Sequence, residues 1–380
     1  MLRKHSLLFG FLLAVGGGAV SASDGIEDGV VHFAQVAALD GPAGALGSGM
    51  RDGILAAFAE ANAAGGVHGR MLELDSYDDG YEPNQAIDLV NQVIGDNNHI
   101  GFIGPVGTPT SRAVQPIATE ANMPFIGPFT GAGFLRDPAL TNVLNVRATY
   151  DAETEEWIRH LVDEKGMQNI AILYQDDGFG RVGLAGVNAA LERRGMSLVA
   201  EGTYTRNTTA VRAALLDIRK AEPDAVVMVG AYSAIGEFVR LSRKLSFDPA
   251  FVTISFVGSR ALVADLGADG EGVIISQVVP FPWDASIPLV AAYQAAMQAH
   301  APGSEPGFVT LEGYVVGRLA VEALKAAGPD LTRDALLNAM TSLGTVDISG
   351  TVLNFGPGDN QGMDEVFLTA IGPNGTFVSQ

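Results

Sequence analysis

The stretch GFIGPVGTPTSRAV, residues 101–114, is an apolar run that stops at glycine and proline and continues into three hydroxyl residues and the start of a helix. A glycine-rich turn before a helix leaves backbone N–H groups free at the positive end of the helix dipole, where an anion binds well. A nucleotide-phosphate loop needs a lysine and a fixed glycine spacing, whereas this stretch has Thr108, Thr110 and Ser111. These groups favour a small carboxylate instead.

The strand-then-helix order of this stretch recurs along the chain. Several expected strands are continuous apolar runs, which are typical of strands covered on both faces, and the segments between them have helical periodicity. This alternation predicts an α/β fold with mainly parallel sheets and right-handed crossovers. The expected strands are VVHFAQVA from Val30, MLELDSY from Met71, IGFIG from Ile100, MPFIGP from Met123, NIAILY from Asn169, SLVAEGTY from Ser197, DAVVMVG from Asp224 and GVIISQVV from Gly272.

The series runs twice, over about residues 29–146 and 150–277. A helix-rich stretch follows through residue 343, and after it we expect a glycine-rich strand pair around TVLNFGPGDNQGMDEVFLTAI, from Thr351. Two similar lobes with exchanged tail segments place a ligand in the cleft between them, at the C-terminal ends of the parallel strands.

The first residues have the pattern of a secretory signal peptide: basic MLRKHS, an apolar run, then small residues. We expect a signal peptide over residues 1–22, cut after Ala22, with a cut after Ser23 nearly as good and a retained membrane anchor as the alternative. The chain has no cysteine, so a lipid cannot be attached to a cysteine after the signal peptide, and no disulfide can form. The expected product is a free periplasmic protein and not a lipoprotein.

Composition and motifs argue against several classes of function. The net charge of −20 repels nucleic acid and anionic lipid surfaces. The six histidines are scattered without metal-ligand spacing, and there is no GxSxG motif. GPGDNQGMD lacks the spacing of a calcium loop and favours a hairpin turn, and Asp176 and Asp177 favour helix capping over acid catalysis. We therefore expect no catalytic residue, no metal, no cofactor and no enzyme.

Three segments carry a more specific signal when taken in order: GPVGTPTSRAVQPIATEANMPFIGPFTGAG, IAILYQDDGFGRVGLAGVNAALERRG and DAVVMVGAYSAIGEFVRLSRKL. Together they resemble the type I periplasmic binding proteins of the leucine/isoleucine/valine-binding branch, the solute receptors of ABC importers. The resemblance covers the whole mature chain and implies two Rossmann-like lobes joined by three crossings, near Arg147, Val279 and Thr345. The implied lobes are 29–146 plus 280–344 and 147–279 plus 345–380.

The resemblance also implies a ligand site shared by the lobes. Thr108 aligns with a carboxylate contact, and the chain departs from the family at Gly131, where a threonine is common, and at Phe179, where a tyrosine is common. The glutamate that holds the ligand ammonium in amino-acid receptors is replaced by Ser255 and Phe256. The expected ligand residues are Val106, Gly107, Thr108, Phe129, Thr130, Gly131, Tyr150, Asp177, Phe179, Tyr232, Ser255 and Phe256.

Two ligand classes remain open at this point. Either Asp176 or Asp177 turns into the cleft and replaces the missing ammonium anchor, or the ligand has no ammonium and aromatic side chains line an apolar pocket. We favour the second. The sequence thus predicts a monomeric solute-binding protein that delivers a small carboxylate-bearing solute to an ABC permease, without nucleic-acid binding or stable membrane insertion. The alternative is a ligand-sensing subunit of the same fold that docks on a receptor or sensor kinase.

Overall fold

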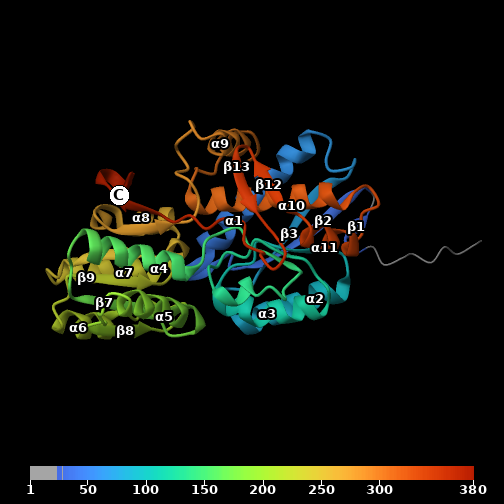
Figure 1. Ribbon diagram of the computed structural model, residues 1–380. Coiled ribbons are helices and arrows are strands. Elements are labelled where there is room, and N and C mark those ends of the chain that lie inside the picture. Colours follow the sequence, from blue (N-terminus) through green and yellow to red (C-terminus); the bar gives the residue numbers. More distant parts are fainter. Residues whose placement is uncertain (1–23, 28) are drawn as a thin grey trace, which may run out of the picture.

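A computed structural model describes residues 24–27 and 29–380, which form two lobes lying side by side (Figure 1). The signal peptide expected over residues 1–22 lies outside the described residues. Each lobe has one mainly parallel sheet with helices on both faces, so the expected α/β class with two lobes is confirmed.

The first sheet has the order β1-β2-β4-β5-β6, with β3 on β2, and every pairing is parallel except that of β1 with β2. Its strands are β1 (Ile26–Glu27), β2 (Val30–Ala37), β3 (Met71–Asp78), β4 (Gly101–Ile103), β5 (Phe125–Ile126) and β6 (Val143–Leu144). The helices of this lobe are α1 (Gly44–Ala63), α2 (Pro83–Asp96), α3 (Thr108–Glu120), α9 (Pro288–His300), α10 (Phe308–Ala327) and α11 (Arg333–Thr341).

The second sheet has the order β15-β14-β11-β10-β9-β7-β8, with β14 and β15 antiparallel to their neighbours. Its strands are β7 (Ile170–Gln175), β8 (Ala200–Tyr204), β9 (Ala225–Val229), β10 (Ala250–Thr253), β11 (Ile274–Gln277), β14 (Phe367–Ile371) and β15 (Phe377–Ser379). The helices are α4 (Tyr150–Ile158), continued by a π-helical segment (Arg159–Glu164), α5 (Gly178–Glu192), α6 (Arg212–Lys220), α7 (Tyr232–Lys244) and α8 (Ser259–Leu266).

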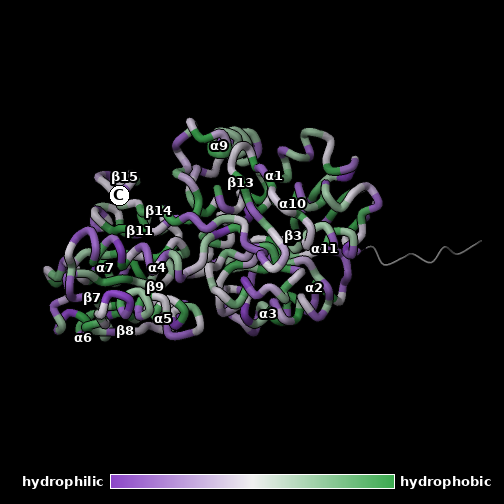
Figure 2. The backbone as a smooth tube through the Cα atoms, viewed as in Figure 1, coloured by the Kyte–Doolittle hydropathy of each residue, from purple (hydrophilic) through white to green (hydrophobic). Residues whose placement is uncertain are grey.

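The central strands are buried on both faces, which explains their continuous apolar sequences. Successive residues of β7 alternate between two cores: Ile170 and Ile172 pack with α4 and α5, whereas Ala171 and Leu173 pack with α6 and α7. The strand β9 is buried along its whole length and is hydrophobic throughout in Figure 2. Successive side chains therefore alternate between the two faces of the sheet, but the hydropathy of the sequence does not alternate, because both faces are buried.

Three chain segments connect the lobes, after β6, after β11 and before β14. The sequence places the third near Thr345, and the contacts of the chain after that residue favour a later position. The hairpin of β12 (Thr345–Ile348) and β13 (Thr351–Asn354) packs on α10 of the first lobe, and the chain then runs beside the first crossing, where Met363 N donates to Val146 O at 2.9 Å. We therefore propose that the first lobe keeps residues 345–354 and that the tail joins the second lobe only after them.

The expectation that the two strands of TVLNFGPGDNQGMDEVFLTAI pair with each other is wrong. The strand β13 pairs with β12, and β14 pairs with β11 of the second sheet. The GPGD sequence does make a tight turn, in which the backbones of Gly356 and Asp359 form two hydrogen bonds with each other. The two strands part after this turn because one belongs to each lobe.

Glycine allows α1 and α10 to pack in close contact. A Cβ atom on Gly53 of α1 would lie 2.1 Å from the carbonyl oxygen of Thr310 and 2.6 Å from the nitrogen of Tyr314. Gly313 of α10 is equally restricted, because its Cβ would lie 2.4 Å from the carbonyl oxygen of Met50. The short approach brings the N-terminal end of α10 against α1.

We predict that Gly53→Ala destabilises the protein, because the methyl group meets rigid backbone and forces the two helices apart. Overpacking of this kind costs about 1–3 kcal/mol, measurable by thermal unfolding. Gly95→Ala is the matched control at an exposed position of α2, where a Cβ meets no atom within 4 Å and alanine is the better helix former. Equal melting temperatures for Gly53→Ala and the parent would contradict the packing argument.

Candidate functional site

The carboxyl ends of the two sheets face each other and bring aromatic side chains from both lobes into one cluster. Phe256 of the second lobe has its ring centroid 5.4 Å from Phe129 and 5.9 Å from Tyr81 of the first, and 4.7 Å from Phe179 of its own lobe. Tyr150, which opens α4 after the first crossing, contacts Phe179 at 5.4 Å. All five side chains are at most 1% exposed, so the lobes are closed on one another. We call these five residues the aromatic cluster.

Gly107 determines the conformation of the loop after β4. This residue has φ +101°, and a Cβ atom there would lie 2.2 Å from the Tyr81 ring, so only glycine fits both the backbone and the space. The loop is tied to the next one, because Phe129 N donates to Pro105 O at 2.8 Å and Gly107 N donates to Phe129 O at 3.2 Å. The two loops that were expected to bind a carboxylate therefore form one rigid unit.

Two hydroxyl groups meet at the start of α3. Thr108 Oγ1 and Thr130 Oγ1 lie 2.7 Å apart, and both residues are fully buried. Thr110 uses its hydroxyl differently, because it donates to the carbonyl oxygens of Val106 and Gly107 in its own loop. Only Thr108 and Thr130 thus present hydroxyls from two loops at one place beside a helix N-terminus.

Asp177 caps α5, as the sequence favoured. Its carboxylate accepts hydrogen bonds from the amide of Phe179 at 2.9 Å, from Gln175 Nε2 at 2.7 Å and from Arg206 at 2.9 Å. Asp176 is paired with Arg181 in a more exposed position. Neither aspartate is free to replace a missing ammonium anchor.

A buried polar network, which the sequence analysis did not anticipate, lies under the aromatic cluster. Arg147 is fully buried, with its guanidinium carbon 4.5 Å from the Phe129 ring centroid and its Nε 3.4 Å from a Glu312 carboxylate oxygen. It also donates through Nη2 to the Ser255 hydroxyl. Glu153 of α4 accepts from both the amide and the hydroxyl of Ser255, at 2.9 and 2.8 Å. The network therefore joins α10 of the first lobe to α4 and to the segment after β10 in the second.

Burial shifts the acid–base behaviour of this network. Desolvation raises the pKa of Glu312 to about 7, and Arg147 only partly opposes that rise. Desolvation alone would lower the pKa of Arg147, but Glu312, Tyr150 and Glu153 together outweigh it and the pKa is raised. The arginine is charged at all ordinary pH values, while its partner on α10 titrates near neutrality.

We predict that the free energy of unfolding falls as the pH rises from about 4.5 to about 7 because of Glu312. The unfolded chain releases this proton near the ordinary value of 4.5 and the folded chain only near 7, so higher pH favours unfolding, by up to about 3 kcal/mol in total. Urea unfolding of the parent and of Glu312→Gln between pH 5 and 8 checks this. Parallel pH profiles for the two proteins would show that Glu312 has no such role.

The rim of the cleft is held by contacts between the lobes. Arg206 pairs with Glu82 at 2.7 Å, and Asn207 donates to Gly80 O at 3.0 Å and to Glu82 at 2.8 Å. Elsewhere on the rim, Ser233 donates to Pro42 O at 2.9 Å. These contacts exist only while the lobes are together.

We predict that Arg206→Ala shifts the protein toward an open form, because the variant loses the ion pair that spans the lobes. The pair is partly exposed, so about 1 kcal/mol, or roughly a fivefold change in the closed-to-open ratio, is expected. Small-angle scattering without added solute should show a larger radius of gyration. Arg181→Ala, whose partner Asp176 lies in the same lobe, is the control and should leave the radius unchanged.

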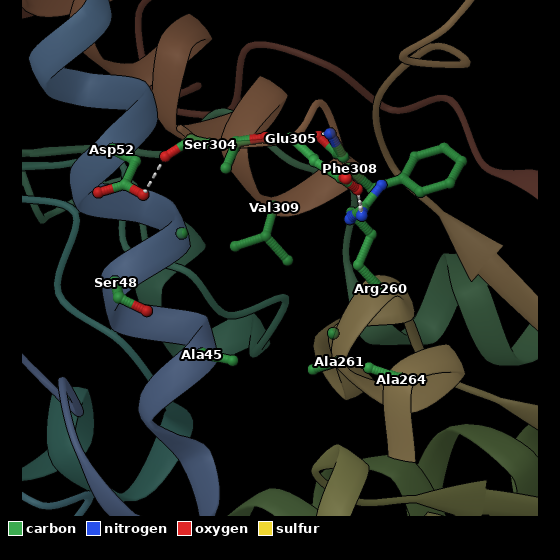
Figure 3. Close-up of a pocket in the computed structure, with 14 residues that line it drawn as sticks. Ala45, Ser48, Asp52, Arg260, Ala261, Ala264, Ser304, Glu305, Phe308 and Val309 are labelled. Carbon is green, nitrogen blue, oxygen red and sulfur yellow. Dashed lines mark hydrogen bonds and ion pairs between the residues drawn. The ribbon is translucent and has the colours of Figure 1, made fainter. Parts of the chain in front are cut away.

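A separate pocket of about 350 Å³ lies to one side of this site. Figure 3 shows Ser48 and Asp52 of α1 on one side of it and Arg260 of α8 on the other. Its charged groups already have partners: Asp52 accepts a hydrogen bond from the Ser304 hydroxyl at 2.9 Å, and Arg260 pairs with Glu305. No residue of the aromatic cluster lines it, so we place the candidate site at the strand ends instead.

The structure gathers most of the residues expected to bind a ligand. Phe129, Tyr150, Phe179 and Phe256 form the aromatic cluster, Ser255 lies in the network beneath it, and Tyr232 lies at the rim, partly exposed. Val106, Gly107, Thr108, Thr130 and Gly131 lie in the joined loops of the first lobe. The residues that sequence reasoning missed are Tyr81, Glu153, Arg206 and Glu312, with Arg147 foreseen only as a crossing point. Their sequence neighbourhoods carry no motif, because each acquires its partners only through the fold.

Residues 30–376 match the sequence model of a family described as periplasmic binding protein. The chain belongs to this family. Among curated relatives, the Leu/Ile/Val/Thr-binding protein of Salmonella typhimurium is 24% identical over 70% of this chain and 73% of the relative. The leucine-specific-binding protein of the same organism is 22% identical over 89% and 90%. The crystal structure of a possible leucine/isoleucine/valine-binding protein from Rhodopirellula baltica is 36% identical, with a TM-score of 0.87 over 95% of this chain and 98% of that one.

Membership confirms the resemblance to type I periplasmic binding proteins of the leucine/isoleucine/valine-binding branch and identifies the chain as a binding protein and not an enzyme. It also implies a periplasmic or extracellular location. Among the described residues, no helix is both long enough and apolar enough to span a bilayer.

Proposed function

We propose that this binding protein captures a small carboxylate-bearing solute, an amino acid or a related organic acid, in the cleft between its lobes and delivers it to an ABC permease. The observation that carries the proposal is the pair of buried hydroxyls, Thr108 and Thr130, 2.7 Å apart beside the N-terminus of α3. One of these hydroxyls donates to the other, so the pair keeps one O–H free, and that donor together with a helix N-terminus suits a carboxylate. The relatives named for leucine, isoleucine and valine support a solute of this size.

The arrangement of the lobes supports capture by closure. A solute favours the closed form only if it contacts both lobes there, and the aromatic cluster has members from both. The rim contacts of Arg206 and Asn207 add to the stability of the closed form, and the Arg206 guanidinium also lies 5.9 Å from the Tyr81 ring centroid. Delivery to a permease is what the resemblance to solute receptors of ABC importers implies, and a sensor protein with this fold would bind its solute in the same way.

We predict that Thr108→Val weakens solute binding about ten- to a hundredfold, because a hydrogen bond to a charged carboxylate is lost. Thr110→Val is the matched control: its hydroxyl serves the loop itself, so the variant should lose stability with a smaller change in affinity. Calorimetry with the best binder from a panel of amino acids and organic acids measures both. Equal, small losses of affinity in both variants would return Thr108 to a purely structural role.

Stimulation of a reconstituted permease distinguishes delivery from sensing. The cognate transporter, which is the permease with its ATPase subunits, should hydrolyse ATP faster in the presence of the solute-loaded protein. The Thr108→Val protein should need more solute for the same rate. Solute binding without any effect on a permease would favour the sensor alternative and would leave the capture of a carboxylate intact.

A further inference from the structure

Hydrogen-bond donors without acceptors lie at the aromatic cluster. Among the residues that the structure describes, Arg147 Nη1 and the Tyr150 hydroxyl are fully buried and make no hydrogen bond, and Arg147 Nε has only the Glu312 carboxylate, at 3.4 Å. The Arg147 guanidinium lies over the Phe129 ring, and the Tyr150 ring contacts Phe179. Buried polar groups normally have partners, so donors left over at a cleft point to a ligand that is rich in acceptors.

The acidic side chains near the cluster are already engaged. Asp177 holds the start of α5 and Arg206, Glu153 accepts from Ser255, and Glu312 faces Arg147. None of these three is available for the cation of a ligand. Asp79 differs, because its Oδ1 accepts from the Tyr81 amide at 2.8 Å while its buried Oδ2 has no partner among the described residues.

The walls of the cleft are hydrocarbon where a cation would need an acceptor. Phe256 contacts Tyr81, Phe129 and Phe179, so it turns a ring and not a polar group toward the centre of the cluster. A primary ammonium group carries three donors and a charge, and its burial against rings without a carboxylate is costly. A carboxylate with an apolar body has neither problem, since its charge suits Arg147 and the threonine hydroxyls.

We infer that the cleft selects a monocarboxylate with an apolar body and no α-ammonium group, and that it discriminates against the matching α-amino acid. This inference rests on the proposed function and makes its substrate class specific. The donors at Arg147, Tyr150 and Thr108 hold the carboxylate, and the rings of Phe129, Phe179 and Phe256 enclose the body of the solute.

Matched pairs of solutes test the inference on the unmodified protein. Calorimetry with 4-methylpentanoate against leucine, and with 3-phenylpropanoate against phenylalanine, changes only the α-ammonium group within each pair. We expect the deaminated acid of at least one pair to bind ten- to a hundredfold more tightly than its amino acid. An amino acid that binds as tightly as its deaminated partner, or more tightly, overturns the inference while the proposed function stands.

Two further results separate the alternatives. If the amino acid binds more tightly than its deaminated partner, loss of its binding in Asp79→Asn would identify Asp79 as the partner of the ammonium group. If neither member of either pair binds, and straight-chain acids from acetate to octanoate and benzoate also fail, the proposed function itself is wrong and the inference fails with it.

Tyr150→Phe tests the donor argument with little change of shape. The variant keeps the ring contact with Phe179 and removes a hydroxyl that has no partner, so we expect about tenfold weaker binding of the deaminated acid and an unchanged melting temperature without solute. Tyr293→Phe is the control, because its hydroxyl is buried in the first lobe and bonded to Gly307 O at 3.3 Å. That variant should lose stability and keep its affinity. Unchanged affinity in Tyr150→Phe would contradict the role of its hydroxyl.

Discussion

The charge of Arg147 is the constraint on which the arrangement of the two lobes depends. A guanidinium without water must have compensating partners, and these come from different parts of the fold: Glu312 from α10 of the first lobe and Ser255 from the second. Glu153 then holds Ser255 through both its amide and its hydroxyl. The first crossing between the lobes is thus fixed by electrostatics at the point where the chain passes from one to the other.

The aromatic cluster follows from this fixed crossing. Arg147 supports the Phe129 ring, and Tyr150 begins α4 three residues further along the chain. Phe256 comes next to Ser255, so the residue that binds the arginine also places the ring that bridges the lobes. The site thus combines the buried charge of Arg147 with the apolar rings of the aromatic cluster. Such a site distinguishes solutes that have similar apolar bodies but different charged groups.

The rim contacts act on a different property, the balance between open and closed forms. Arg206 lies between Asp177 of its own lobe and Glu82 of the other, and it is partly accessible to water. Its contribution is therefore modest compared with that of the buried groups. Closure depends on these rim contacts together with the buried contacts of Phe256 with Phe129 and Tyr81 across the lobes.

The sequence by itself determined the repeated strand–helix order, the two lobes and the loops at the strand ends, because apolar runs, helical periodicity and glycine at turns are local properties. The turn at Gly107 and the capping role of Asp177 could be predicted for the same reason, since each concerns the backbone within a few residues, whereas the close approach of the Tyr81 ring to Gly107 could not. Only the tertiary structure decided that Glu312, 165 positions after Arg147, is its partner, that Tyr81 joins the aromatic cluster, and that β13 and β14 belong to different lobes. These contacts join segments that are far apart in the chain and form only when the folded surfaces pack together and exclude water. A local sequence pattern therefore does not predict them.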